Sequence, residues 1–366
     1  MSDSSSTSIT DRLVADSAAR LFSQQVDAAM RLRAEGGAFD AALWQRVADA
    51  GFSVMLASES AGGLAQSWSA AFPVLRGIGY WQVPLPLAET MVAALLSSIA
   101  GLEVPDGPLT LIEQGQGNDF DVGGSAGAPT LTGVAHAVPW ARHASAALVS
   151  LADGRLTLLH LRDNSGVTVQ PHVNHAGLPS DTLVLRDARC AAAKSNPLAL
   201  QQPVWLLGAV ARCAMLVGAL ESALEHAVRY AGERIQFGKP IGKYQAIQQN
   251  LALLAGDVAA ARVAALVAAA DAPHCAALDC AATPFSAAVA KVRAGEAATR
   301  GSAIAHQVHG AIGFTQEHPL HFATRRLWAW REEFGTDAHW AAVLGRAAIR
   351  GRAGGFWPSL TEKHFP

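Results

Sequence analysis

The chain has 366 residues, of which 51% are hydrophobic and 16% are charged, and its formal net charge is −2. This length and apolar content are typical of a globular protein with two or three domains, and the near-neutral charge without basic runs excludes an electrostatic footprint for nucleic acid. The polar, acidic start MSDSSSTSITD does not match a signal or transit peptide, and the four cysteines are scattered, so we expect a cytoplasmic protein with free thiols and no metal site.

Residues 1–105 are predicted to form an N-terminal helical domain. The segments ALWQRVADAGF (42–52) and ETMVAALLSSIAG (89–101) place apolar residues at helical spacing, and each reaches a glycine that suits the end of a helix. The prolines of VPLPLAE (83–89) predict a connection between two helices.

The character of the sequence changes near Pro105. Short β-branched runs follow, separated by turn residues, and LADGRLTLL predicts a hairpin around Asp153-Gly154. We therefore expect a compact middle β domain at 106–196.

Strand signals end at Pro197, and four long apolar segments with a period of about 3.6 residues follow. These segments lie at 203–232, 241–272, 283–311 and 318–350. They predict a C-terminal antiparallel four-helix bundle over 197–366, and so an α+β fold. The most apolar stretch, 203–220, carries Arg212 in its middle, which favours a buried helix over a membrane span.

The first chemistry-bearing motif interrupts this helical part at RYAGERIQFGKPIGKYQAIQQN, residues 229–250. Arg234 at a helix end can bind a pyrophosphate through its planar guanidinium. Phe237 can lie against an aromatic ring, and Gln245 can bind a ring edge or a phosphate. The alternative is a solvated turn between helices with a phenylalanine in the core.

The second motif is HQVHGAIGFTQEHP, residues 306–319. Gly310 and Gly313 interrupt a helix beside Gln307, and glycine there permits close approach of a backbone or a ligand phosphate. The alternative is a helix-ending turn in which glycine supplies a positive φ. No predicted strand precedes GAIG, so this is not a dinucleotide-binding fingerprint.

Together the two motifs, at this separation and in this order of domains, resemble the acyl-CoA dehydrogenase family, and the resemblance covers nearly the whole chain. The first motif carries the resemblance through Arg234, Phe237, Gly238, Ile241 and Gln245. The second carries it through Gln307, Gly310, Ala311, Gly313, Phe314, Glu317 and Pro319.

The resemblance implies FAD as cofactor, an oligomer, and α,β-dehydrogenation of an acyl-CoA thioester in fatty acid or steroid degradation. It also implies an electron-transferring flavoprotein as a partner. In such enzymes the Arg, Phe and Gln positions of the first motif contact the adenine dinucleotide half of FAD that is bound mainly by the neighbouring subunit. They act as a clamp that reaches across the subunit interface. The cofactor-binding residues that the resemblance implies here are Arg234, Phe237, Gln245, Gln307, Gly310, Ala311 and Thr336.

The chain departs from the family at the catalytic base. The family's usual glutamate precedes a Gly-Thr pair, but here Phe334 precedes Gly335-Thr336. Some members place the base on the first bundle helix instead, at a distance that corresponds here to a position near Gly208. No carboxylate lies between Pro203 and Gly218.

Glu333 is therefore the candidate base, one residue away from the usual position. A shift of one residue rotates a side chain by about 100° on a helix. The alternative is that Glu332 and Glu333 form a solvated charged face beside Arg331.

The β domain departs as well. The family has an acidic loop beside the flavin, and IEQGQGND (112–119) matches it poorly. The family also has a Trp and a Ser/Thr that flank the flavin, and LTGVAHAVPW (131–140) has Ala137 and Pro139 at these positions. Trp140 either packs on the flavin or is a core tryptophan.

Positions that serve the chain's own flavin are thus lost, whereas those that serve a neighbour's FAD are present. The sequence favours a base-deficient subunit that completes the FAD site of a catalytic partner chain in a hetero-oligomer. The alternatives are a self-sufficient homomeric dehydrogenase with Glu333 as base, a non-enzymatic binding or scaffolding relative, and an oxidase or monooxygenase relative. The sequence does not specify the acyl group.

Overall fold

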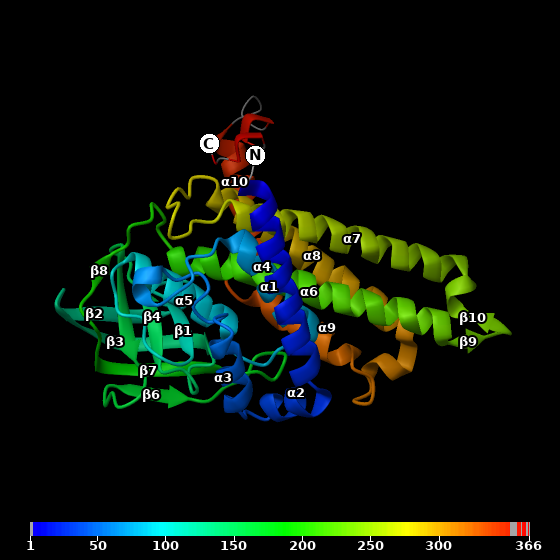
Figure 1. Ribbon diagram of the computed structural model, residues 1–366, viewed down its shortest axis with the longest axis horizontal. Helices are drawn as coiled ribbons and strands as arrows, with labels where there is room; N and C mark the ends of the chain where they lie inside the picture. The colour runs from blue at the N-terminus through cyan, green and yellow to red at the C-terminus, as the bar shows by residue number, and fades with distance from the viewer. Residues whose placement is uncertain (1–2, 352–356, 360, 364, 366) are drawn as a thin grey trace.

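A computed structural model describes residues 3–351, 357–359, 361–363 and 365. Its order is helices, strands, helices, which confirms the predicted fold class (Figure 1). The domain bounds 1–105, 106–196 and 197–366 remain predictions, and residues 1–2, 352–356, 360, 364 and 366 within them lie outside the described part of the chain.

The N-terminal part is helical and packs on the bundle. Its helices are α1 (Asp3–Gln25), α2 (Ala28–Glu35), α3 (Ala41–Asp49), the 3-10 turn η1 (Glu59–Ala61), α4 (Trp68–Trp81) and α5 (Leu87–Ile99). The side chains of Asp27, Asp40 and Ser67 accept backbone N–H groups at the starts of α2, α3 and α4. Residues 87–97 of α5 are all buried, as expected for a helix that is apolar all round.

The middle part consists of two four-stranded sheets with the orders β1-β4-β5-β8 and β2-β3-β7-β6. The strands are β1 (Leu109–Glu113), β2 (Asp119–Ser125), β3 (Ala128–Pro139), β4 (Ala146–Ser150), β5 (Arg155–His160), β6 (Val167–Gln170), β7 (Ser180–Arg189) and β8 (Lys194–Ser195). The antiparallel pair β4–β5, with Gly154 at φ 82°, is the hairpin that LADGRLTLL predicted.

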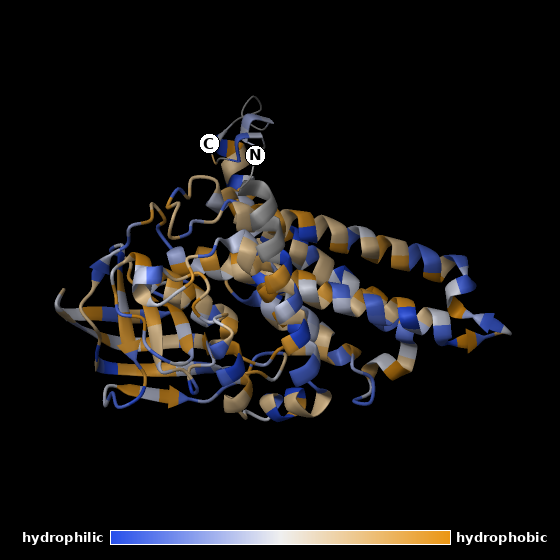
Figure 2. Ribbon diagram, in the orientation of Figure 1, coloured by the Kyte–Doolittle hydropathy of each residue, from blue (hydrophilic) through white to orange (hydrophobic). Residues whose placement is uncertain are grey.

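The C-terminal part is a helical bundle around the buried helix α6. Its elements are α6 (Pro203–Glu233), β9 (Ile235–Gln236), β10 (Lys239–Pro240), η2 (Ile241–Lys243), α7 (Gln245–Ala270), α8 (Thr283–His309), η3 (Gly310–Phe314), α9 (Leu320–Glu332) and α10 (Asp337–Arg350). Helices α4, α7, α8 and α9 all pack against α6. Hydrophobic residues run along the strands and the bundle helices, whereas β10 is hydrophilic (Figure 2).

Among the described residues, two helices, α6 and α7, are long and apolar enough to cross a membrane by length and composition alone. The apolar window of α6 is 94% buried inside the fold, as predicted for a core helix, whereas that of α7 is 33% buried. Burial of α6 places Arg212 in the interior, where a charge needs a partner.

The prediction of one helix over 318–350 is wrong, because α9 ends at Glu332 and α10 begins at Asp337. Phe334 and Gly335 have φ values of 53° and 92°, which no α-helix accommodates. Thr336 then caps α10, its hydroxyl oxygen accepting the N–H of His339 at 3.0 Å.

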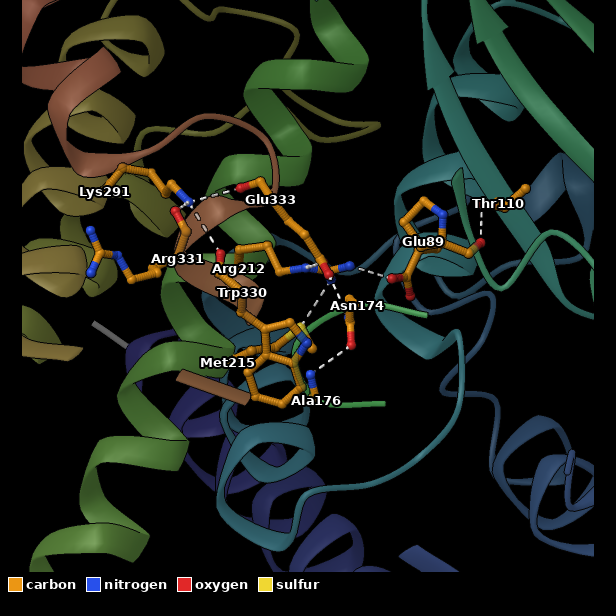
Figure 3. Close-up of polar contacts among 11 residues, drawn as sticks. Glu89, Thr110, Asn174, Ala176, Arg212, Met215, Lys291, Trp330, Arg331 and Glu333 are labelled. Atoms are coloured by element: carbon orange, nitrogen blue, oxygen red, sulfur yellow. Dashed lines mark hydrogen bonds and ion pairs between the residues drawn. The ribbon is translucent and has the colours of Figure 1, made fainter. Parts of the chain in front are cut away.

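A buried lysine stabilises this break from the neighbouring helix. The Lys291 ammonium on α8 donates to the carbonyl oxygens of Trp330, Arg331 and Glu333 at 3.3, 3.1 and 2.8 Å (Figure 3). These carbonyls belong to the open C-terminal end of α9, where a cation is favourable. Burial lowers the pKa of Lys291 to about 8.

Candidate cofactor clamp and pocket

The first motif forms a small hairpin beyond the end of α6. Strands β9 and β10 pair antiparallel, and the two residues between them, Phe237 and Gly238, have φ values of 52° and 82°. Two successive positive φ values are typical of the primed turns that join tight hairpins. The hairpin lies at the tip of the molecule, far from the β domain (Figure 1).

Phe237 at this tip is 93% exposed, so the alternative of a core phenylalanine is wrong. A bulky residue with positive φ is strained, and such strain gathers at ligand clamps and functional sites. The base of the hairpin is fixed, because the Tyr244 hydroxyl donates to the Gln236 carbonyl at 3.0 Å and Lys239 Nζ lies 4.4 Å from the Tyr244 ring centroid. The exposed ring is therefore presented on a fixed support.

The structure brings the second motif to the same end of the bundle. Helix α8 ends beside the end of α6, where the rings of Tyr230 and His309 stack with centroids 4.7 Å apart. Gly310 follows with φ 63°, so glycine supplies the positive φ that ends α8, as the turn alternative predicts. Both interpretations of this motif therefore stay open.

The clamp residues are exposed to solvent: Arg234, Phe237, Gln245, Gln307, Gly310 and Ala311. Within the described part of the chain, the side chains of Arg234, Gln245 and Gln307 have no hydrogen-bonding or ionic partner. Such free donors on a fixed surface fit an anionic diphosphate with an adjacent ring, the chemistry of the adenine dinucleotide half of FAD.

Thr336, the remaining predicted cofactor residue, lies away from the clamp. It follows Phe334, whose ring lines a pocket of about 650 Å³ between the β domain and the bundle. The walls come from β1, β3 and β7, from the loop 172–175, from Trp205 on α6 and from the end of α9. The β domain and the β9–β10 hairpin lie at opposite ends of the molecule (Figure 1), so the chain's own clamp does not border its own pocket.

The two positions that the resemblance implies for a catalytic base converge at this pocket. A Cβ atom added to Gly208 would lie 2.5–2.7 Å from three atoms of the Phe334 ring, so the ring lies directly on the bare backbone of α6. Trp205 meets the same ring edge-on at 6.1 Å, and the Arg212 guanidinium lies 5.3 Å from its centroid. A phenyl ring and a glycine thus occupy the place where a carboxylate is expected.

Glu333, the candidate base, is held by two neighbours. Its Oε2 accepts from Arg212 Nε at 2.6 Å and its Oε1 accepts from Asn174 Nδ2 at 2.9 Å (Figure 3). Its side chain is 16% exposed, so the alternative of a solvated charged face is wrong for Glu333. A solvated charged face describes Glu332 better, because the Glu332 side chain is 45% exposed and its Oε1 lies 3.4 Å from Arg331 Nε.

Sequence reasoning missed the residues that hold Glu333. Arg212 is 2% exposed and also pairs with the buried Glu89 of α5. Burial alone would lower the pKa of Arg212, but the carboxylates of Glu89 and Glu333 raise it. A lone arginine in an apolar helix already signals a buried ion pair. The loop residue Asn174 gave no such signal.

The pocket offers little to a flavin ring. The backbone N–H of His136 is bound to Asn118 Oδ1 at 2.8 Å, Pro139 has no N–H, and β3 has an irregular register between Ala135 and Val138. Trp205 Nε1 is the buried side-chain donor of this pocket without a partner among the described residues. Trp140 is 4% exposed and belongs to the core, as its second interpretation predicted. The pocket residues therefore do not fit a flavin ring, whereas the clamp residues fit the dinucleotide half of FAD.

One buried carboxyl in the pocket wall predicts a dependence of stability on pH. Burial raises the pKa of Glu113 to about 7, although hydrogen bonds from Ser150 and from the start of α6 act in the opposite direction. Because the folded state binds this proton more tightly, its stabilisation is full below the ordinary pKa of 4.5 and is lost as the pH rises through 7.

Glu113→Gln is therefore expected to remove a decline on the order of 3 kcal/mol in the free energy of unfolding between pH 5 and 8. Glutamine keeps an oxygen for the N–H of Trp205, which donates to Glu113 at 2.9 Å. Urea unfolding at the two pH values measures the decline, with Glu103→Gln on the exposed surface as control. An unchanged decline in Glu113→Gln would contradict this assignment.

Comparisons with known proteins agree on one family. Residues 206–349 match the sequence profile "Acyl-CoA dehydrogenase, C-terminal domain". Acyl-CoA dehydrogenase FadE27 of Mycobacterium tuberculosis (strain ATCC 25618 / H37Rv) is 31% identical over 315 residues, 77% of this chain and 81% of FadE27. Acyl-CoA dehydrogenase IpdE2 of the same organism is 29% identical over 299 residues, 79% of this chain and 80% of IpdE2.

Two solved structures share the fold over nearly their whole length. A variant of the Tcur3481-Tcur3483 steroid ACAD superposes with a TM-score of 0.82 at 25% identity, covering 95% of this chain and 99% of that chain. The ChsE4-ChsE5 complex from Mycobacterium tuberculosis superposes with a TM-score of 0.81 at 23% identity, covering 92% and 96%.

Proposed function

Because the chain belongs to the acyl-CoA dehydrogenase family, we propose that it is a base-deficient subunit that completes the FAD site of a catalytic partner chain. The complex carries out α,β-dehydrogenation of an acyl-CoA thioester. In that reaction FAD supplies the hydride acceptor, and a glutamate of the partner chain removes the α proton.

One observation carries the proposal: the contrast between the two ends of the chain. At the clamp, Arg234, Gln245 and Gln307 are exposed and unpartnered within the described residues, and Phe237 projects from a fixed hairpin. At the pocket, the Phe334 ring covers Gly208. A chain that used its own pocket would need a carboxylate base there. A chain that serves a neighbouring subunit needs only an accessible clamp.

The proposal extends to partner and substrate by analogy of fold alone. A chain with this fold occurs in the ChsE4-ChsE5 complex, and the Tcur3481-Tcur3483 structure is described as a steroid ACAD. A second acyl-CoA dehydrogenase subunit is therefore the proposed partner, and a bulky CoA ester such as that of a steroid side chain is the proposed substrate. An electron-transferring flavoprotein is the proposed electron acceptor.

Arg234→Ala tests the clamp. Loss of an arginine–phosphate contact is expected to weaken FAD retention by the complex about ten- to a hundredfold, since such a contact contributes roughly 1.5–3 kcal/mol. Flavin content after dialysis of the co-purified complex measures this. Arg229→Ala is the matched control, because Arg229 is an exposed arginine in the last two turns of α6, just before Arg234, and pairs with Glu225 at 2.9 Å.

Equal flavin content in Arg234→Ala and Arg229→Ala would contradict the clamp. Absence of flavin from every complex of the unmodified chain would favour the scaffolding alternative. The homomeric alternative needs Glu333 as a free base, but both of its carboxylate oxygens are already bound.

A further inference from the structure

Three charged side chains from three segments meet behind Phe334. Arg212 on α6 pairs with Glu89 on α5 through Nη2 and with Glu333 after α9 through Nε, the latter at 2.6 Å. Their side chains are 2%, 3% and 16% exposed in that order. We refer to Glu89, Arg212 and Glu333 as the charge network (Figure 3).

The loop of the β domain locks this charge network in place. Asn174 Nδ2 donates to Glu333 Oε1 at 2.9 Å, while Asn174 Oδ1 accepts the backbone N–H groups of Ala176 and Leu178 at 3.0 and 3.1 Å. The asparagine amide is therefore fully oriented by its own loop. It binds Glu333 Oε1, whereas Arg212 binds Oε2.

The charge network lies between two cavities of very different size. The pocket beside Phe334 has a volume of about 650 Å³. The second cavity, enclosed by α5, α6, α9 and the end of β3, has a volume of about 10 Å³, the space of one water molecule. Pro139, Asn174 and Glu333 line both cavities, so they form the wall between them.

We propose that the charge network is a partition that determines which ligands the pocket accepts: it closes the pocket against alkyl chains that would extend between α5 and α6. The wall consists of Pro139, Asn174 and Glu333, and the space behind it is filled by Arg212 and Glu89. A ligand in this pocket stays outside the interior of the bundle. This inference goes beyond the proposed function, because it concerns this chain's own pocket and not the clamp.

The charges make this partition hard to displace. An apolar chain that enters has to break charge-assisted hydrogen bonds and leave buried ions without partners, which the burial of a few methylene groups does not offset. A flexible apolar wall of the same volume would yield to such a chain more readily. The ions therefore add selectivity that shape alone does not give.

The test uses two matched substitutions at the wall. Glu333→Ala removes the wall, whereas Glu333→Gln keeps its volume and an oxygen for Asn174 or Arg212. In both variants the Arg212–Glu89 pair stays charge-balanced. A third variant, E89A/R212A/E333A, removes the wall and the filling behind it without leaving an unpaired charge.

Binding of hexanoic acid and of dodecanoic acid to the purified chain is measured directly, for each acid separately, by isothermal titration calorimetry. The unmodified chain and Glu333→Gln are expected to bind dodecanoic acid no better than hexanoic acid. In the triple variant, affinity for dodecanoic acid is expected to rise about fourfold for each methylene that enters the opened space, or about ten- to a hundredfold for two or three methylenes, with Glu333→Ala between the triple variant and the unmodified chain.

Two results would overturn the partition: preference for dodecanoic acid already in the unmodified chain, or no gain in a folded triple variant. If the triple variant does not fold, Glu333→Ala against Glu333→Gln decides, and equal affinities for dodecanoic acid refute the proposal. Flavin plays no part in this measurement, so its failure is distinguishable from failure of the proposed function.

Discussion

Replacing Arg212 with methionine is expected to destabilise the chain by about 3–5 kcal/mol. Arg212 is 2% exposed, and its removal leaves the Glu89 carboxylate buried without a counter-ion and Glu333 bound by Asn174 alone. Calorimetry is expected to show a fall of several degrees in the unfolding temperature.

A charge-balanced variant separates charge from packing. In E89L/R212M/E333Q no ion remains, the buried Glu89–Arg212 pair is replaced by hydrophobic side chains of similar volume, and the glutamine introduced by E333Q keeps an oxygen for Asn174; replacing a buried ion pair with hydrophobic residues is often neutral or stabilising. We therefore expect this variant to unfold near the temperature of the unmodified chain. Equal unfolding temperatures for Arg212→Met alone and the unmodified chain would contradict a buried, paired Arg212.

The second large effect concerns the catalytic base. In a complex with a partner chain that has a glutamate before its Gly-Thr pair, replacing that glutamate with glutamine is expected to lower kcat about 10²- to 10⁴-fold. Glu333→Gln in this chain is expected to leave kcat within about twofold, because Glu333 is bound to Arg212 and Asn174 and Phe334 stands at the usual position.

Turnover per bound flavin distinguishes the two assignments, since it corrects for any loss of folded complex. Loss of turnover in Glu333→Gln with full turnover in the partner variant would reverse the roles and support the homomeric alternative. The Glu89–Arg212 pair remains in Glu333→Gln, so a stability effect much smaller than that of Arg212→Met is expected.

The helices could be predicted because their signals are local. Pro203 and Pro284 lie at the starts of α6 and α8, and apolar periodicity runs between these starts and the following breaks. The break at 333–336 has local signals in Gly335 and Thr336, but the apolar period that continues across it favours one long helix. The break depends on the Lys291 ammonium from another helix and on a phenylalanine with positive φ, which propensities do not predict.

The candidate site could be predicted only where its residues lie close together in the sequence. The clamp motif is contiguous, so Arg234 and Gln245 can be proposed as cofactor-binding residues from the sequence, but the solvent exposure of Phe237 depends on how the hairpin projects. The contact of Phe334 with Gly208 joins residues far apart in the chain, and no spacing rule reveals it. Arg212 did give a signal, but its partners Glu89 and Asn174 became visible only in the fold.

The visible absorption spectrum and flavin stoichiometry of this chain, purified alone and then with a catalytic partner, test the central claim most directly. We expect the isolated chain to be colourless, or coloured and unchanged by acyl-CoA, and the complex to contain FAD that bleaches when acyl-CoA is added. An isolated chain with stoichiometric FAD that bleaches with acyl-CoA would be a complete enzyme and would contradict the donated clamp.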